Sequence, residues 1–297
     1  MERYIKMSQT LSLRINMNKA REKIASVLFF TAAAMSIFCV VLICVFLFAG
    51  GVPAIFKIGP VDFLFGLTWR PSSNLFGIFP MIVASISVTA LALLFAAPIG
   101  ILTAVFLSKF CHKKMEAALT PLVSLLAAIP SVVFGLFGLV VIAPIIQEIS
   151  GGSGKTMLTA AIILAIMIFP TIIAVSQAAI KAVPNAYYEG ALALGASKEE
   201  SVFFAMLPAA KSGIIASVVL GLGRCVGETM AVIMVAGNQP RIPGGLFDGV
   251  RTLTANIVLE MGYASDLHRE ALIATAVVLF VFILIVNLTF AAIKKRI

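Results

Sequence analysis

The chain has 297 residues, of which 61% are hydrophobic and only 12% are charged. That balance excludes a soluble globular domain and indicates an integral membrane protein. The net charge of +9 does not indicate nucleic-acid binding, because the basic residues lie beside long apolar runs, where they set orientation in a bilayer.

Six apolar runs are predicted to cross the membrane. Residues 1–24 are polar and basic and lack the features of a cleaved signal peptide, and the run 25–49 after them is long enough to span a bilayer. The other predicted spans are 80–108, 119–146, 157–180, 212–236 and 271–293. Prolines interrupt several of them, a feature that suggests a transport pathway, at Pro98, Pro130, Pro144 and Pro170. We predict an all-α membrane protein with one six-helix domain, 25–293, and short tails, 1–24 and 294–297.

The distribution of basic residues predicts the orientation. Fifteen Lys and Arg residues lie in the alternate segments 1–24, 109–118, 181–211 and 294–297, whereas six lie in 50–79, 147–156 and 237–270. The positive-inside rule therefore places both termini and the loop 181–211 in the cytoplasm. Trp69 and several Phe residues suggest that 50–79 lies at the lipid interface. Segment 237–270, with an amphipathic stretch at 253–261, is either a connector or part of an outer gate facing a solute-binding protein.

The cytoplasmic loop carries the clearest local pattern. A helical pattern over residues 185–194 stops at Gly195, the residue type best suited to a left-handed position after a helix. Ser197 and Glu200 then form a capping-box pattern that begins a second helix, ending near Pro208. The loop is predicted to be a helix–turn–helix on the membrane surface.

The spacing E-G-A-x3-G-x9-A-M-L-P in this loop resembles the EAA loop of ABC-importer permeases, E-A-A-x3-G-x9-I-x-L-P. Gly190 replaces an alanine and Ala205 an isoleucine. In that family the loop inserts into a groove of an ATPase subunit and transmits its closure to the membrane helices. An ordinary amphipathic connector is the alternative. The resemblance implies that the ATPase-coupling residues are Glu189, Gly190, Ala191, Gly195, Leu207 and Pro208.

Arg224 and Glu228 are the only arginine and glutamate well inside an apolar run. Each costs roughly 2.5–3.5 kcal/mol if it faces lipid at the bilayer centre, so a polar interior is expected. Arg224 is the candidate contact for a translocating anion, because its guanidinium matches phosphate-type oxygens. An intrahelical Arg224–Glu228 ion pair is the alternative interpretation.

Helical periodicity divides the fifth span into two faces. One face is a candidate pathway lining and carries Ser217, Gly221, Arg224 and Glu228. Gly223 and Gly227 lie nearly opposite and form a small-xxx-small pattern suited to close helix packing.

The motif G-E-T-M-A-V at 227–232 resembles the C-type permease family of phosphate-specific (Pst) ABC importers, as do W-R-P at 69–71 and I-P-S-V-V-F-G at 129–135. The resemblance implies a type I ABC importer permease (MetI-like) architecture and translocation of inorganic phosphate across the bacterial cytoplasmic (inner) membrane. Thr229 joins the substrate-pathway set through this motif. The implied partners are a second homologous permease of the A type, two ATPase subunits and an extracytoplasmic phosphate-binding protein.

Neither an ATPase site nor another catalytic site is expected in this chain. Residues 151–156 read G-G-S-G-K-T but lack the earlier glycine of a phosphate loop, because position 149 is isoleucine. The four cysteines and two histidines have no disulfide or metal-ligand spacing, so no metal or cofactor is predicted. Alternatives are a permease for sulfate or molybdate, a secondary transporter with Glu228 as proton carrier, and an intramembrane enzyme.

Overall fold

The computed structural model describes the backbone of residues 2–296 and the side chains of residues 22–292. The chain divides into two units, Met1–Gly50 and Gly51–Ile297. The first belongs to one long helix, α1 (Glu2–Ile58), so no break separates the predicted tail 1–24 from the predicted first span. The most apolar window of α1 has a mean hydropathy of 2.8, as expected of a membrane-spanning helix.

The second unit begins with short elements and continues as a helical bundle. Its first half contains α2 (Pro60–Phe65), β1 (Trp69–Arg70), η1 (Pro71–Ser73), β2 (Leu75–Phe76), α3 (Phe79–Val105), η2 (Phe106–Phe110), α4 (Lys113–Ala128), α5 (Ser131–Phe137), η3 (Gly138–Ile142) and α6 (Ala143–Ser150). Its second half contains α7 (Met157–Lys181), α8 (Asn185–Ala193), α9 (Lys198–Glu200), η4 (Ser201–Met206), α10 (Leu207–Ala209), α11 (Lys211–Gly227), α12 (Met230–Val235), α13 (Leu253–Met261) and α14 (Asp266–Arg296). Strands β1 and β2 form an antiparallel hairpin in which Trp69 pairs with Phe76.

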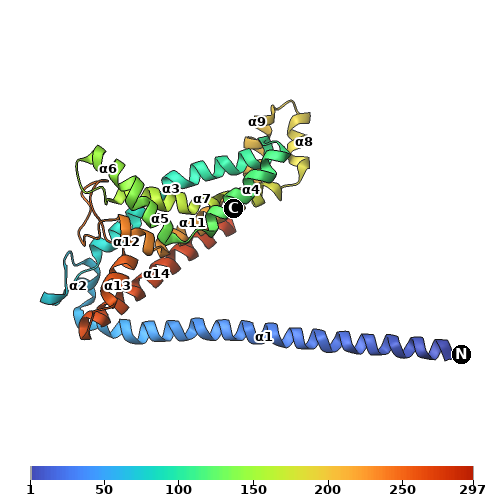
Figure 1. The fold of residues 1–297 in the computed structure, drawn as a ribbon, viewed down its shortest axis with the longest axis horizontal. Coiled ribbons are helices and arrows are strands. Elements are labelled where there is room, and N and C mark those ends of the chain that lie inside the picture. The colour runs from blue at the N-terminus through green and yellow to red at the C-terminus, as the bar shows by residue number, and fades with distance from the viewer. Residues whose placement is uncertain (1, 297) are drawn as a thin grey trace. The chain divides into compact units, whose positions relative to one another are not determined.

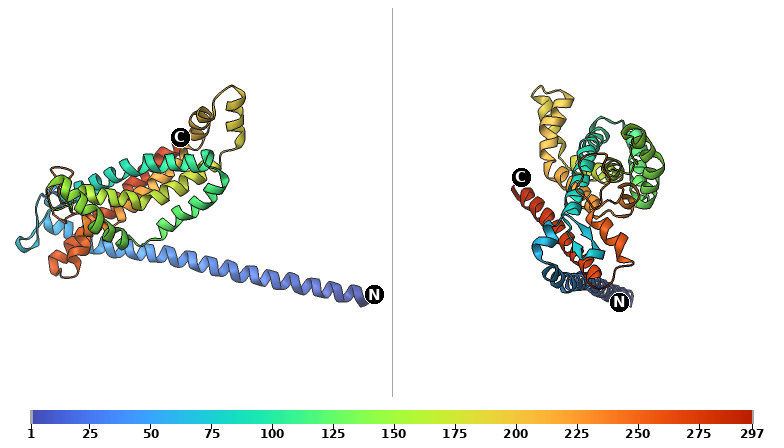
Figure 2. Two further views of the ribbon diagram at one scale, coloured as in Figure 1. Left: turned by 45° about the horizontal axis from the view of Figure 1, so that its top comes forward. Right: turned by 90° about the vertical axis from the view of Figure 1, so that its left-hand side faces the viewer.

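The two ends of this unit differ in character. Helices α8 and α9 lie at one end, and the carboxyl end of α14 points the same way, whereas α2, α6 and α13 lie at the opposite end (Figures 1 and 2). Among the described residues, five helices are long and apolar enough to cross a membrane. The pair 198–209 and 211–227, bent by 71°, is a sixth candidate. The all-α class and the number of predicted spans are therefore confirmed.

Two predicted spans are interrupted more strongly than expected. The predicted span 119–146 is divided at Ile129-Pro130, and the apolar segment that qualifies as a span runs from Ser131 to Ser150. A proline disfavours helical backbone in the residue before it, and Ile129 is accordingly extended, with φ −67° and ψ 128°. The predicted span 212–236 is also not one helix, because α11 ends at Gly227 and α12 begins at Met230.

Helix α7 forms the centre of the bundle. In its apolar window 61% of the residues are buried, about twice the share found in the other spans of this unit. Alanines of α3 face the core and allow close approach, and Gly100 of α3 lies against Ile172, where an added Cβ would come within 2.8 Å of the isoleucine side chain. A helix covered by other helices on most sides provides the fixed support for the segments on either side of it.

Trp69 is not at a lipid interface, contrary to the prediction. Its side chain is 7% exposed, and its indole N–H donates to Oε2 of Glu260 at 2.8 Å. The other carboxylate oxygen of Glu260 pairs with Arg251 at 2.6 Å, and His268 Nε2 lies 2.8 Å from Oε2. His268 is therefore a partly buried member of a polar cluster.

Candidate functional site

The fifth span is broken at the residues that carry the charges. Glu228 has extended backbone, with φ −72° and ψ 131°, and Thr229 precedes the first turn of α12. Oε1 of Glu228 accepts a hydrogen bond from the backbone N–H of Ala231 at 3.1 Å. The prediction that Glu228 shares a helical face with Ser217, Gly221 and Arg224 is therefore wrong, because the helix ends before it. A break of this kind within an apolar span occurs where neighbouring protein or a cavity satisfies the freed backbone groups.

A threonine from another element forms a hydrogen bond with the backbone at the break. The hydroxyl of Thr254, in α13, donates to the backbone carbonyl of Glu228 at 3.1 Å. Thr254 was not among the predicted site residues, because a threonine near the start of a helix looks like an ordinary capping residue. No pattern in the sequence connects it with a residue 26 positions earlier.

Arg224 lies one turn before the break. Its Nη1 donates to the hydroxyl of Thr171 in α7 at 3.4 Å, and the residue is partly buried. Among the described residues, no ion pair joins Arg224 to Glu228. The two side chains therefore do not neutralise each other, and the interpretation as a self-contained intrahelical pair loses its support.

The other residues assigned to the pathway face in different directions. Ser217 is fully buried, with its hydroxyl 2.8 Å from that of Ser176 in α7. Gly221 also packs against α7, where an added Cβ would lie 3.2 Å from Ile172. In this structure both residues therefore form a helix contact and do not line open space. Thr229 is partly buried, and its hydroxyl donates to the carbonyl of Gly227 at 3.3 Å.

The small-residue pattern meets no helix of this chain. An added Cβ at Gly223 or at Gly227 would find no atom within 4 Å, apart from neighbouring residues and the helix's own backbone. The predicted close packing at these glycines is thus absent from the part of the chain that the structure describes. The pattern leaves a flat, uncovered strip on α11.

The loop 181–211 has the predicted helix–turn–helix form. Helix α8 ends in a left-handed Gly195 with φ +92°, and the N–H groups of Gly195 and Ala196 bond to the carbonyls of Leu192 and Ala191 at 3.0 and 3.1 Å. These two bonds are the Schellman arrangement that satisfies the end of a helix. The predicted capping box is also present, with both reciprocal hydrogen bonds between Ser197 and Glu200. The second helix is π-helical over Ser201–Met206, a variation that the sequence did not indicate.

The loop has a packed base and also carries large apolar side chains that are exposed. Val183, Val202 and Met206 are buried and form a small core with the end of α3. Leu194 is 92% exposed and Phe204 is 80% exposed. The residues of the EAA-like motif follow the same division. Leu207 and Ala191 are partly buried, whereas the exposed set is Glu189, Gly190, Gly195 and Pro208.

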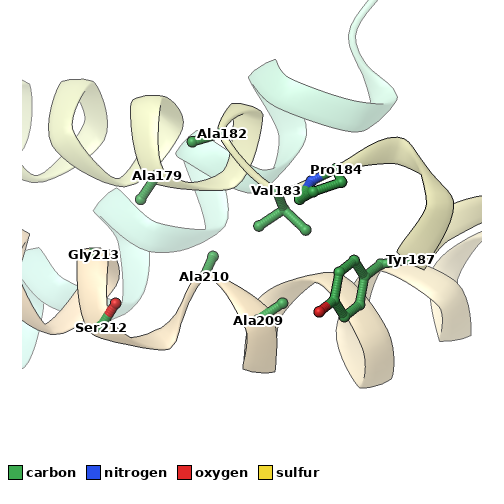
Figure 3. Close-up of a pocket in the computed structure, with 9 residues that line it drawn as sticks. All are labelled: Ala179, Ala182, Val183, Pro184, Tyr187, Ala209, Ala210, Ser212 and Gly213. Carbon is green, nitrogen blue, oxygen red and sulfur yellow. The ribbon is translucent and has the colours of Figure 1, made fainter.

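A groove of about 360 Å³ lies at the base of the loop, where α7 leads into α8 and α10 leads into α11 (Figure 3). Tyr187 stands at one edge, and small side chains line much of the rest (Figure 3). The lining residues are Ala179, Ala182, Val183, Pro184, Tyr187, Ala209, Ala210, Ser212 and Gly213. The two arms of the loop are therefore separated by an accessible space at this point.

Curated relatives cover most of the chain. The "Probable ABC transporter permease protein YqgH" of Bacillus subtilis is 37% identical over 239 residues, with 77% of each chain covered. The "Phosphate transport system permease protein PstC" of Mesorhizobium japonicum is 35% identical over 275 residues, with 84% of each chain covered. The protein of the same name from Pasteurella multocida is 33% identical over 245 residues, with 76% of this chain and 77% of that one covered.

Solved structures and a family model agree with these relatives. A chain of a bacterial ABC transporter involved in alginate import superposes with a TM-score of 0.59 at 18% identity, over 90% of this chain and 96% of that one. A chain of the MetNI methionine ABC transporter, in an inward-facing conformation, superposes with a TM-score of 0.59 at 17% identity, over 77% and 99%. The fold is thus that of type I ABC importer permeases. Residues 96–297 match the model of the "Binding-protein-dependent transport system inner membrane component". With two thirds of its length in that match, the chain belongs to this family of inner-membrane permease subunits.

Proposed function

We propose that this chain is the transmembrane permease subunit of an ATP-driven importer that carries inorganic phosphate across the bacterial cytoplasmic membrane. The observation that carries the proposal is a partly buried arginine, one turn before a break in an apolar span, with no carboxylate paired to it among the described residues. A cation in that setting needs an anionic or polar partner, because a lipid environment penalises it. The similarity to phosphate permeases supports phosphate as that anion.

Energy for transport comes, in this proposal, from two ATPase subunits that dock on the cytoplasmic loop. The exposed Leu194 and Phe204 supply apolar contact area, and exposed Glu189 supplies charge beside it. The groove in Figure 3 provides space for a partner side chain between the two arms of the loop. Gly190 fits this role as well as the family's alanine does, because an added Cβ there would meet open space.

A second permease subunit, of the A type, completes the pathway in this proposal. The uncovered strip at Gly223 and Gly227 suits the close approach of a helix from that subunit. Small residues at such positions allow two backbones to come together in a membrane, where dispersion and not hydrophobic burial drives association. An extracytoplasmic phosphate-binding protein would deliver substrate to the end of the unit that contains α2, α6 and α13.

Glu228 gives the pathway its selectivity in this proposal. A carboxylate repels a dianion unless the anion brings a proton to share. Hydrogen phosphate carries a P–O–H donor near neutral pH, whereas sulfate carries none. Arg224 would therefore attract both anions, and Glu228 would disfavour sulfate, so that discrimination arises from a built-in penalty.

The test uses the complete transporter reconstituted in vesicles. Arg224→Ala should abolish phosphate uptake and phosphate-stimulated ATPase activity while the complex still assembles. Arg224→Lys should recover only part of the uptake, because an ammonium group keeps the charge but loses the planar fork. Lys155→Ala removes an exposed cation before α7 and serves as the control. Normal uptake by Arg224→Ala would exclude the proposed role, and uptake driven by a proton gradient without ATP would instead indicate a secondary transporter.

Selectivity is measured on Glu228→Gln. Sulfate, which should compete poorly with phosphate in the unaltered transporter, should compete more effectively once the carboxylate is neutral. An unchanged ratio of phosphate to sulfate uptake would count against the role of Glu228 without affecting that of Arg224.

A further inference from the structure

The break in the fifth span exposes backbone groups that have to be satisfied inside a membrane protein. The last carbonyl groups of α11 have no partner in the helix, and the extended Glu228 adds another carbonyl. Thr229 satisfies the carbonyl of Gly227 from within the span. The carbonyl of Glu228 is satisfied from a different element, by the hydroxyl of Thr254 at 3.1 Å.

The hydroxyl of Thr254 belongs to a short chain of hydrogen bonds with a defined direction. Thr252 Oγ1 lies 3.1 Å from Thr254 Oγ1 and accepts from the backbone N–H of Ala255 at 3.2 Å. A hydroxyl has only one proton to donate. Because Thr254 donates its proton to Glu228, the proton between the two threonines comes from Thr252. The chain therefore runs from Ala255 through Thr252 and Thr254 to the carbonyl of Glu228.

Helix α13, which carries Thr254, is held at both ends. At its start the backbone N–H of Leu253 donates to the hydroxyl of Ser85 in α3 at 3.0 Å. At its end the buried Glu260 binds Trp69, Arg251 and His268. Helix α13 is thus attached to the core on one side and to the loop-rich end of the unit on the other, so its first turn is a fixed point against which the break can be positioned.

We propose that Thr254 is a positioning residue for transport, which fixes the backbone of Glu228 and with it the direction of the Glu228 carboxylate. The inference rests on the proposed role of Glu228 in selectivity. From the sequence, segment 237–270 could be either a connector or part of an outer gate. The inference gives α13, which lies in this segment, a role in supporting the substrate pathway. Thr254 acts through Glu228 and is not itself required to touch the anion.

The variants are chosen to distinguish the effect of the Thr254 hydroxyl from the effect of the rest of the side chain. Thr254→Val keeps the branched shape and loses the donor, whereas Thr254→Ser keeps the donor. Thr275→Val is the matched control, because Thr275 is fully buried but donates to the carbonyl of Ala271 in its own helix, away from the break. All variants are assayed in the assembled transporter.

In transport assays, Thr254→Val should lower kcat for phosphate by about two- to tenfold, the effect of losing one net hydrogen bond. It should also raise competition by sulfate, while Thr254→Ser and Thr275→Val stay close to the unaltered protein. In the Glu228→Gln background, Thr254→Val should change selectivity no further, since residues that act through one another are not additive. Additive effects on selectivity would overturn the inference.

A second measurement does not depend on how Glu228 interacts with the substrate. Cys225 is 3% exposed, and its carbonyl accepts from the N–H of Glu228 at 3.2 Å, so it reports on the same turn. With Cys39, Cys44 and Cys111 replaced by serine, Thr254→Val should increase modification of Cys225 by a small methanethiosulfonate reagent severalfold over Thr275→Val.

The two measurements distinguish the two ideas. If Glu228→Gln leaves selectivity unchanged while Thr254→Val increases Cys225 labelling, the role of Glu228 fails but Thr254 still holds the break. Suppose instead that Thr254→Val and Thr275→Val show the same Cys225 modification and the same phosphate transport, while Glu228→Gln alters selectivity. The proposed positioning role of Thr254 is then wrong.

Discussion

At the scale of single residues, Ser197 and Glu200 show how a turn of the loop 181–211 is fixed. The backbone N–H of Ser197 donates to the carboxylate of Glu200 at 2.7 Å, and the Ser197 hydroxyl accepts from the N–H of Glu200 at 3.2 Å. The pKa of Glu200 lies below its ordinary value of 4.5. The larger cause is the hydrogen bond from the Ser197 backbone, and the smaller cause is hydrogen bonding with the Ser197 side chain. The ionised carboxylate is therefore part of the cap.

This linkage has a definite sign. Because the pKa of Glu200 is lower in the folded loop, the capping interaction is fully present above about pH 4.5 and is lost as the pH falls through the lowered value. We expect Ser197→Ala to bring that pKa part of the way back toward 4.5, since the backbone N–H remains. Amide hydrogen exchange of residues 198–201 at neutral pH should become about fivefold faster, as for the loss of one helix cap. Lys198→Ala, which removes no cap, is the control, and equal exchange in both variants would contradict this account.

At the scale of elements, Glu260 joins four segments, of which the hairpin is 191 residues away in the sequence. It lies in α13 and binds Trp69 of the hairpin, Arg251 of the preceding loop and His268 of α14. The side chains of Glu260 and Arg251 are only 8% and 15% exposed. Removing one partner of a buried pair leaves the other charge uncompensated, which costs more than the pair itself contributes.

We therefore expect a graded loss of stability in this cluster. Glu260→Ala should lower the free energy of unfolding by roughly 3 kcal/mol, because Arg251 stays behind without its carboxylate. Trp69→Phe, which removes one donor to a charged acceptor, should cost about 1.5–3 kcal/mol. Lys57→Ala breaks an exposed ion pair with Glu270 and should cost about 1 kcal/mol or less. Denaturation midpoints in one detergent give the order, and an equal loss in all three variants would contradict it.

The sequence predicted those elements whose signals are local. The predicted stretch 253–261 is the helix α13, and Gly195 has the predicted positive φ, since caps and turns depend on adjacent residues. The break at Glu228 was not predicted, because neither proline nor a turn dipeptide marks it. The carbonyl of Glu228 accepts its hydrogen bond from Thr254, which lies in another element. Trp69 was misplaced because its partner Glu260 is 191 residues away in the sequence and contacts it only in the folded chain.

At the scale of the whole molecule, two of the segments with excess positive charge, 109–118 and 181–211, contact each other at one end of the second unit. Lys109 contacts Asn185 at the start of α8, and Lys181 forms an ion pair with Glu116 of α4. The connection between α3 and α4 and the loop 181–211 therefore lie together, which agrees with the prediction that both are on one side of the membrane. The loop 151–156 precedes α7, at the opposite end of that helix from the loop 181–211.

This arrangement makes the proposed orientation testable with two single cysteines in a background without native cysteines. Ser153→Cys places a thiol in the exposed loop before α7, and Lys114→Cys places one near the exposed start of α4. In right-side-out vesicles a membrane-impermeant maleimide should label position 153 at once, but position 114 only after the membrane is permeabilised. Inside-out vesicles should reverse the pattern, which controls for intrinsic reactivity. Labelling of position 114 from the outside would place the loop 181–211 on the outer side of the membrane, away from cytoplasmic ATP. No ATPase could then drive this chain through that loop.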